Sequence, residues 1–406
     1  MSPLSAYLHE SCIHDDLITR LAYTRDASMY RLIPEAVVRP KNEQEVRSLL
    51  EYGRSSSMPI TFRTAGTSLS GQSITTGIIA EVLYDWQKFK ILENGDAIWS
   101  QPGVNGAVAN KILAPYQRRI GPDPASINAA RIGGIVSNNS SGMVCGTEFN
   151  AYHTLKDIEF ILPNGNGYDT SKPGEKENFI QNEPDLAIGL LKIKTEIESN
   201  SSWIGKIREK YRIKNTIGYS MNSFLDYNHP LDIFSHLLVG AEGTLAFIAN
   251  VTLKTIPDPP EKGTGLLLFN SPESAGNSVP YFKSMGASAI EFLDDESLRT
   301  AQHFENPPYD PNRVEDDVTG LLIEYQDSSK NEIDRLIEES KQFSKKESSV
   351  ISMKLVTDQQ DRETIWKIRK GLYPTLGSLR RTGTSIITED IAVDAENLAQ
   401  AIRGLK

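Results

Sequence analysis

Two stretches of small residues and one short turn carry the residue types that could bind a large anionic ligand. The first, FRTAGTSLSGQS at residues 62–73, follows a predicted strand and places small and hydroxylated residues between Gly66 and Gly71. Small side chains let the backbone curl so that successive N–H groups point at one anion, and Thr67, Ser68 and Gln72 add donors. The stretch therefore indicates a diphosphate site, although taken alone it fits an ordinary glycine-rich turn somewhat better. It has neither the GK[ST] of a Walker loop nor the GxGxxG of a nicotinamide-binding domain.

The second stretch lies within residues 120–155. Nearly every residue between Gly133 and Gly142 is small or carries an amide or hydroxyl group. Such residues fill a core poorly, but they let the backbone pass close to a large planar or diphosphate ligand. The side chains of residues 138–141 could satisfy ligand oxygens as well as their own backbone.

The third stretch, VGAEGTLAFIA at residues 239–249, is a short turn inside an apolar run. Glu242 and Gly243 predict a turn between two strands. Alone, such a turn indicates little about function.

Composition narrows the classes of protein to which this chain can belong. Its 406 residues, 39% hydrophobic and 24% charged, predict a globular protein of two or three domains. The net charge of -10 argues against nucleic acid as a partner, because phosphate contact needs a basic surface. Cys12 and Cys145 are far apart, so this sequence supplies no disulfide framework, no zinc site and no iron–sulfur ligand set. A reducing compartment is therefore expected.

The N-terminus lacks a basic region followed by an apolar core, and no apolar run approaches the ~20 residues of a membrane span. We therefore expect a cytoplasmic protein without a transmembrane segment, and peripheral contact with the inner membrane is left open.

The elements that must position these stretches follow from the spacing of apolar residues. After a polar helical arm over 1–33, a domain over 34–258 is predicted. It begins with a strand at 36–38 and a helix that Asn42 caps and that has Val46, Leu49 and Leu50 on one face. Residues 170–235, rich in lysine and glutamate, predict a solvated helical insertion to which no chemistry is assigned.

The linker TIPDPPEKG at 255–263 precedes a second unit over 259–406. Strands and helices alternate there, which predicts an α+β sandwich with helices on one face and a strand over 384–393. The last helix runs to the C-terminus with no cap and no closing strand, so this domain is expected to be incomplete.

Taken together, in this order and spacing, the three stretches resemble the FAD-binding domain of the vanillyl-alcohol oxidase and p-cresol methylhydroxylase (PCMH) fold. The narrower resemblance is to its D-lactate dehydrogenase and glycolate oxidase branch. It covers residues 20–406 and includes YTRDASMY, RTAGTSLSGQ, GPDPAS, IGGIVSNNSSGM, VGAEGTLAFI, IRKGLYP and TEDIAV. The segments KNTIGYSMNSFLDYNHPLDIFSHLLVGAEGTL and SSGMVCGTEFNAYHTLKD resemble the long subgroup that fuses the flavin half to an iron–sulfur half.

The resemblance implies an α+β fold: a PCMH-type FAD-binding domain of two α+β subdomains, followed by a truncated, ferredoxin-like α+β cap domain. It also implies that one loop holds the FAD diphosphate, through Thr64, Ala65, Gly66, Thr67, Ser68, Gly71 and Gln72. The flavin and adenosine would be lined by Pro122, Asp123, Ser126, Gly133, Gly134, Asn138, Ser140, Ser141 and Gly142. The same cleft would be closed by Glu242, Gly243 and Thr244.

Family members with covalent FAD often attach it through a histidine in the diphosphate loop. Thr67 stands at that place, so the resemblance implies non-covalent FAD. His153 lies near in sequence, but a core or surface histidine is the favoured interpretation.

On the substrate side, the resemblance implies oxidation of a D-2-hydroxyacid to the 2-oxoacid. D-lactate is favoured, with glycolate and 2-hydroxyglutarate left open, and electrons would pass to a cytochrome or quinone. Arg369 stands where the family places a cation for the substrate carboxylate, although a solvated helix face fits it equally well, and Glu389 and Asp390 are more readily structural.

The family's HAxxGNxH motif, which supplies histidines for substrate or metal, is absent from this sequence. No metal site is therefore expected here, and any iron–sulfur cluster would belong to a missing C-terminal half. Two rival interpretations remain: a flavin-dependent synthase of the alkyl-glycerone-phosphate type, and an inactive FAD-binding fragment.

Overall fold

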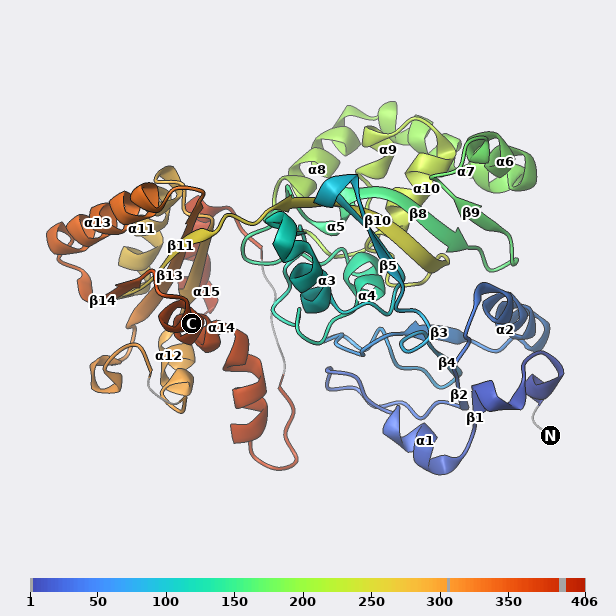
Figure 1. Cartoon of the computed structure of the whole chain (residues 1–406), viewed down its shortest axis with the longest axis horizontal. Helices are drawn as coiled ribbons and strands as arrows, with labels where there is room; N and C mark the ends of the chain where they lie inside the picture. The colour runs from blue at the N-terminus through green and yellow to red at the C-terminus, as the bar shows by residue number, and fades with distance from the viewer. Residues whose placement is uncertain (1–2, 305–306, 387–391, 406) are drawn as a thin grey trace. The chain divides into compact units, whose positions relative to one another are not determined.

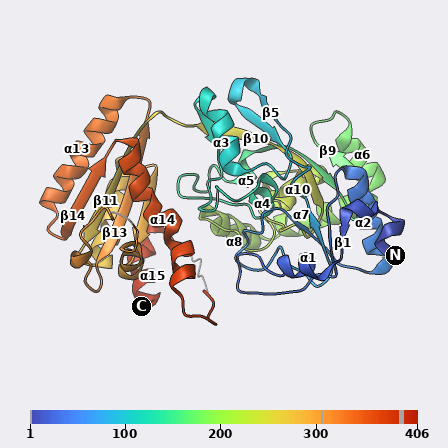
Figure 2. The same ribbon diagram turned by 60° about the horizontal axis from the view of Figure 1, so that its bottom comes forward.

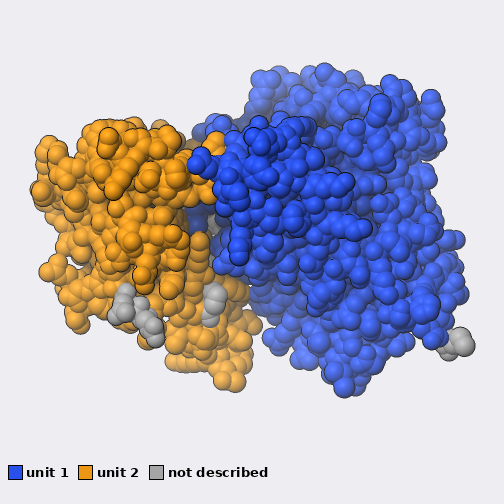
Figure 3. Space-filling model, in the orientation of Figure 1, with its two compact units in different colours: residues 1–256 blue, residues 257–406 orange. Residues whose placement is uncertain are grey.

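The computed structural model describes residues 3–304, 307–386 and 392–405 of the chain. The chain divides into two compact units, Met1–Ile256 and Pro257–Lys406 (Figure 1, Figure 3). Each unit has its own sheets and its own buried apolar clusters.

Unit 1 begins with a small mixed sheet. Its order is β1 (Ile13–His14), β2 (Ala36–Val38), β4 (Ile78–Glu81) and β3 (Ile60–Arg63). The last three strands are parallel, and helix α2 (Glu43–Ser56) makes the connection between β2 and β3. The predicted cap is confirmed, because Asn42 Oδ1 accepts a hydrogen bond from Glu45 N at 3.0 Å. Val46 and Leu49 are fully buried, so the amphipathic pattern of α2 faces the core.

A second sheet forms the rest of unit 1. Its order is β5 (Phe89–Leu92), β6 (Ala97–Ser100), β10 (Phe247–Pro257), β8 (Leu155–Ile161) and β9 (Gly167–Asp169), and β7 (Arg118–Ile120) also pairs with β10. Three short helices accompany it: α3 (Gly106–Leu113), α4 (Ile132–Ser137) and α5 (Ala151–Thr154). Asn94 and Gly95 have positive φ, as an NG turn between β5 and β6 requires.

The helical insertion is present, but its predicted solvated character is only partly right. Its helices are α6 (Glu175–Asn182), α7 (Pro184–Glu198), α8 (Ser201–Arg212), α9 (Ser223–Asp226) and α10 (Pro230–Leu238). Phe179, Leu190, Phe224 and Phe234 are buried in the same cluster as residues of the sheet. Many lysines and glutamates lie on the outer faces, whereas these four apolar residues meet the core, because a helix presents its faces separately.

The predicted strand before the Glu242 turn is wrong. Residues 236–238 end α10, so the turn joins a helix to β10 and not one strand to another. An apolar run of this length fits a buried helix as well as a strand, and α10 is buried over most of its residues.

Unit 2 is an antiparallel sheet with helices on both faces. The sheet order is β12 (Ala289–Leu293), β13 (Thr319–Asp327), β11 (Glu261–Phe269) and β14 (Val350–Val356). Helices α11 (Pro272–Ser284) and α13 (Lys330–Lys346) share an apolar cluster with Leu267, Leu321 and Ile323. Helix α15 (Leu398–Leu405) joins this cluster through Leu398.

The opposite face of this sheet is covered as well, which corrects the prediction of helices on one face. Helix α14 (Gln359–Leu379) buries Trp366 there, and Trp366 Nε1 donates to the carboxylate of Glu324 on β13. An unpredicted short helix, α12 (Asp295–Ala301), places Leu298 against the same face. Figure 2 shows α13 and α14 on opposite sides of the sheet. The continuous apolar runs of β11 and β13 are typical of strands buried on both faces.

The predicted strand over 384–393 is not present in the parts that the structure describes, residues 384–386 and 392–393. The remainder, with Glu389 and Asp390, lies outside the described residues. In the described part of the chain, no helix has both the length and the hydropathy to cross a bilayer.

Candidate cofactor site

The loop over residues 64–73 is held in shape by two glycines and by the N-terminal arm. Gly66 and Gly71 have φ of 67° and 83°, in the left-handed region that favours glycine. Ala27 N donates to Gly66 O at 3.1 Å, and Ser73 Oγ donates to Asp26 Oδ2 at 3.1 Å. The N-terminal arm therefore contacts the loop directly.

Two of the predicted donors interact within the loop. The side chains of Ser68 and Gln72 are in contact, and Ser68 Oγ also accepts from the N–H groups of Ser70 and Gln72 at 3.2 Å each. Two backbone N–H groups thus converge on one oxygen, which is the local geometry that an anion oxygen would use.

Arg63 is a member of this site that the sequence reasoning did not single out. Its Nη1 donates to Ser73 O at 3.4 Å, and its Cζ lies 5.3 Å from the centre of the Tyr23 ring. A Cβ atom built on Gly66 would be only 2.5 Å from Arg63 Nη2, so the guanidinium lies directly against the loop. Burial lowers the pKa of Arg63, and the Asp26 carboxylate opposes that shift. Its position at the end of a strand, immediately before the loop, was the available signal.

The glycine-rich run meets this loop through α4. A Cβ atom on Gly134 would lie 3.3 Å from Thr64 Oγ1, and one on Gly133 would lie 2.5 Å from Pro102 Cβ. Gly133 N donates to Pro102 O at 3.0 Å. The two glycines therefore permit a close approach between backbones that larger residues would prevent.

The Glu242 turn joins the other end of the same run. Asn138 Nδ2 donates to Glu242 Oε1 at 2.7 Å, and Glu242 N donates to Ser137 O at 2.8 Å. Both Glu242 and Gly243 have positive φ, 53° and 73°. Burial raises the pKa of Glu242, and the hydrogen bond from Asn138 opposes that shift. All three stretches that the sequence singled out thus meet around one run of small residues.

Thr244 completes the turn. Its Oγ1 donates to Ala241 O at 2.6 Å and lies 3.0 Å from the hydroxyl of Tyr219. Tyr219 belongs to the helical insertion, to which the sequence analysis assigned no chemistry.

Asp123 orders the end of the run. Its two carboxylate oxygens accept from Val144 N at 3.1 Å and Cys145 N at 3.2 Å. A Cβ atom on Gly142 would lie 2.0 Å from Asp123 O. Burial raises the pKa of Asp123, and nearby Arg119 opposes the shift. Asp123 therefore shapes the backbone through partly buried hydrogen bonds.

The remaining predicted residues occupy different surroundings. Pro122 is buried, and Ser126 is exposed, with its carbonyl accepting from Ala129 N and Ala130 N. Ser140 Oγ donates to Asn138 Oδ1 at 3.0 Å. Ala65 and Thr67 are partly exposed in the loop.

Two buried polar atoms near the run have no hydrogen-bond partner: Ser141 Oγ and Nε of Arg131, the residue that precedes α4. Buried polar groups are rarely left unpaired, so such atoms indicate that a ligand completes the site. Together with the converging amides, the glycines and the Arg63 guanidinium, they fit a diphosphate-containing cofactor. Among the described residues, no group of three or more His, Cys, Asp or Glu is placed to hold a metal ion.

His153 is exposed, and its Nδ1 lies 2.7 Å from Thr147 O. Of the two interpretations, a core or a surface histidine, the structure shows the surface one.

Arg369 belongs to unit 2 and is ion-paired. Its Nε donates to Glu291 Oε2 at 2.7 Å, and its side chain is 35% exposed. The pair links α14 to β12 on the sheet face that also carries Glu324, the partner of Trp366 of α14. Arg369 is therefore not simply a solvated side chain on a helix face.

Two family models match the chain: an FAD binding domain over residues 34–171 and the C-terminal domain of FAD linked oxidases over residues 258–406. D-2-hydroxyglutarate dehydrogenase of Pantoea ananatis is 26% identical over 94% of this chain and 39% of its own length. Glycolate oxidase subunit GlcD of Escherichia coli is 25% identical, over 87% of this chain and 60% of its own. Mitochondrial D-lactate dehydrogenase [cytochrome] of Kluyveromyces lactis is 25% identical, over 92% of this chain and 57% of its own length. The chain thus spans about two fifths of the length of the hydroxyglutarate dehydrogenase.

Solved structures agree on the fold. Alkyldihydroxyacetonephosphate synthase aligns with a TM-score of 0.60 at 14% identity, covering 89% of this chain and 62% of its own. Substrate-bound p-cresol methylhydroxylase aligns with a TM-score of 0.59 at 13% identity. The alignment covers 92% of this chain and 70% of the methylhydroxylase chain. The predicted PCMH-type α+β fold is confirmed. The chain belongs to the FAD-linked oxidase family, in which an FAD-binding domain precedes an FAD-linked oxidase C-terminal domain.

Proposed function

We propose that this chain binds FAD non-covalently and oxidises a D-2-hydroxyacid to the corresponding 2-oxoacid. The observation that carries the proposal is the meeting of loop 64–73, run 133–142 and turn 242–244 in unit 1. The relatives' names, which include dehydrogenases of D-2-hydroxyglutarate and D-lactate and a glycolate oxidase subunit, support the substrate class.

The residues of unit 1 would hold the cofactor. The amides of the loop and Arg63 would bind the diphosphate, because an anion is stabilised by converging N–H dipoles and a fixed guanidinium. Asn138 and Glu242 would brace the cleft, and Ser141 would donate to the ligand. The bound FAD would supply a hydride acceptor for oxidation of the carbon that bears the hydroxyl group.

On the substrate side, Arg369 would bind the carboxylate of the hydroxyacid. Its partner Glu291 holds the guanidinium through Nε, which fixes the plane of the group before substrate arrives. We favour D-lactate, with glycolate and 2-hydroxyglutarate as the competing substrates, and a cytochrome or quinone as the electron acceptor. Cys12 and Cys145 are buried single cysteines, so any iron–sulfur cluster in the electron path would be bound by residues other than those of this sequence. A cytoplasmic location with peripheral membrane contact is part of the same proposal.

The purified chain is expected to be yellow and to release its flavin on acid or heat treatment. Thr67 occupies the place of the attaching histidine, and the nearest histidine in sequence after the loop, His153, is exposed and bonded to Thr147 O. The measurement is flavin absorbance in the supernatant after protein precipitation. Flavin that stays with the pellet would contradict non-covalent binding.

The reaction itself is tested by anaerobic bleaching of the bound flavin. D-lactate, D-2-hydroxyglutarate and glycolate are added separately, and a D-2-hydroxyacid is expected to remove the flavin absorbance. The matched control is L-lactate, which has the same charge and composition but the opposite configuration.

The likeness to alkyldihydroxyacetonephosphate synthase supports one rival, a synthase that performs no net oxidation. That rival predicts flavin that stays oxidised with every hydroxyacid. An inactive FAD-binding fragment also predicts flavin that stays oxidised with every hydroxyacid. It differs from the synthase because it would not turn over an alkyl-glycerone-phosphate precursor, so adding that precursor separates the two rivals.

A further inference from the structure

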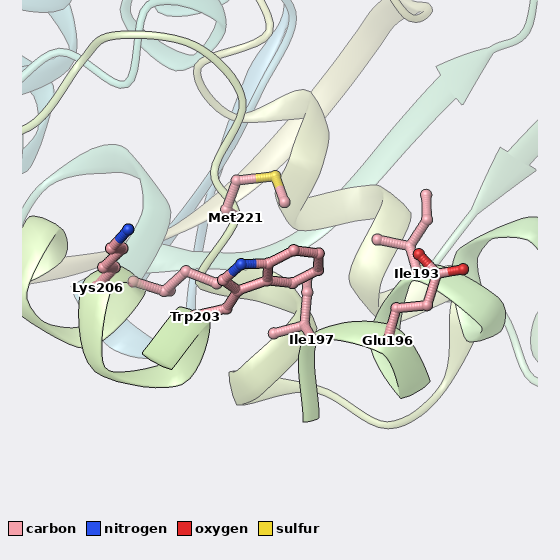
Figure 4. Close-up of a pocket in the computed structure, with 7 residues that line it drawn as sticks. Ile193, Glu196, Ile197, Trp203, Lys206 and Met221 are labelled. Carbon is pink, nitrogen blue, oxygen red and sulfur yellow. The ribbon is translucent and has the colours of Figure 1, made fainter. Parts of the chain in front are cut away.

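A group of exposed apolar and basic side chains lies on the helical insertion, outside the three stretches of the cofactor site. A pocket of about 290 Å³ opens between α7, α8 and the segment that follows α8. Its apolar lining comes from Ile193, Ile197, Trp203, Ile207 and Met221. Figure 4 shows the Trp203 indole between Met221 and Ile197. Lys206 and Glu196 are its charged members.

Two apolar side chains of this pocket, and a third beside α8, reach the surface. Trp203 is 47% exposed, Ile193 is 41% exposed and Ile217 is 73% exposed. Lys210 Nζ donates to Ile217 O at 3.3 Å, which places Ile217 beside α8. We call Ile193, Trp203, Lys206, Lys210 and Ile217 the α8 patch. Exposed apolar groups gathered with a pocket indicate an interaction surface, whereas single ones do not.

The charge of the α8 patch is opposite to that of the chain. Residues 201–214 contain five basic side chains and one acidic one, in a chain of net charge -10. Trp203, Lys206 and Lys210 recur at helical spacing, so they share one face of α8. The acid, Glu209, is already paired with Arg212 at 3.0 Å. An anionic partner would therefore be attracted at this face, although the chain as a whole carries an excess of acid.

We propose that the α8 patch docks on the surface of a membrane rich in anionic phospholipid. Trp203, Ile193 and Ile217 would enter the boundary between headgroups and acyl chains, and the pocket would admit part of an acyl chain. Lys206 and Lys210 would extend their charged ends to the lipid phosphates while their methylene stems lie along apolar surface.

Charge argues against a second copy of the chain as the occupant. In a symmetric dimer the same patch meets itself, so the basic faces of two α8 helices would oppose each other. The proposal rests on the proposed function, because a protein docked on the membrane could reduce a lipid-soluble quinone there. Its test needs no substrate, so the two can fail independently.

The experiment is sedimentation of the holoenzyme with vesicles of phosphatidylcholine alone or mixed with phosphatidylglycerol. Binding to the mixed vesicles is expected, weaker at high salt because lysine–phosphate attraction is screened. Trp203 is the most exposed of the four tryptophans, since Trp86 and Trp366 are buried and Trp99 is partly covered. A blue shift of intrinsic fluorescence on binding is therefore expected, and Trp203→Ala should remove it.

The contribution of charge is tested with the double variant Lys206→Glu and Lys210→Glu. This double variant should lower partitioning onto phosphatidylglycerol vesicles by about tenfold or more, since each basic residue near an anionic surface contributes to binding. Glu196→Gln should raise it. The matched control is Lys345→Glu with Lys346→Glu, which makes the same charge change in the last turn of α13.

FAD content should be equal in all variants. The proposal is overturned if wild-type protein ignores the anionic vesicles, or if the patch and control variants bind equally. It is also overturned if Trp203→Ala converts a dimer to a monomer, or if only an acidic protein binds the patch.

Discussion

Gly66→Val is expected to abolish FAD binding while the apoprotein keeps its fold. Gly66 has φ of 67°, where a residue with a Cβ atom costs about 1–2 kcal/mol. Its new Cβ would lie 2.5 Å from Arg63 Nη2 and 2.8 Å from Cζ. The guanidinium cannot give way freely, because it is bonded to Ser73 O and packed on the Tyr23 ring. Overpacking of this kind costs about 1–3 kcal/mol.

Relief of both strains requires the loop to leave the geometry that binds the diphosphate. FAD affinity should therefore fall by about a hundredfold or more, at roughly tenfold for each 1.4 kcal/mol. The measurement is flavin absorbance relative to protein absorbance after gel filtration, with circular dichroism to check the fold.

The matched control is Gly165→Val, which also places valine at a positive φ but without the clash. Gly165 has φ of 92° in the turn between β8 and β9, and a Cβ there would meet nothing within 4 Å. This variant should lose some stability and keep its flavin. Equal flavin content in Gly66→Val and wild type would mean that loop 64–73 is only a turn.

Arg369→Met is expected to lower kcat/KM for the hydroxyacid by about tenfold to a hundredfold. A hydrogen bond to a charged group contributes about 1.5–3 kcal/mol, and a guanidinium can bind a carboxylate with two parallel bonds. Arg369→Lys should recover only part of the rate, because lysine keeps the charge and loses the planar fork. FAD content should be equal in all three proteins, since Arg369 belongs to unit 2 and the cofactor site to unit 1.

The control for Arg369 is Arg335→Met on α13. Arg335 is also ion-paired, with Glu332 and Glu339, and it lies on a helix that covers the other face of the same sheet. Its loss should leave kcat/KM unchanged. The measurement is the steady-state rate of each variant with a soluble dye as electron acceptor. If Arg369→Met is as fast as wild type, another residue binds the substrate carboxylate.

The sequence alone predicted the family and the order of most main elements, and it singled out the three stretches that meet at the candidate cofactor site. These depend on local signals: the continuous apolar runs of β11 and β13, the Asn42 cap of α2, and the small residues of run 133–142. Local signals survive in a single sequence because backbone propensity and side-chain period act over a few residues.

Only the tertiary structure decided which distant residues complete the site. Asn138 and Glu242 are separated by 104 residues, and Arg369 and Glu291 by 78. The packing of the N-terminal arm on Gly66, the guanidinium of Arg63 against the loop, and the helices on both faces of the second sheet are likewise long-range results. No short pattern encodes such pairs, because each depends on how the strands are ordered in space and on which side chains the folded core leaves without other partners.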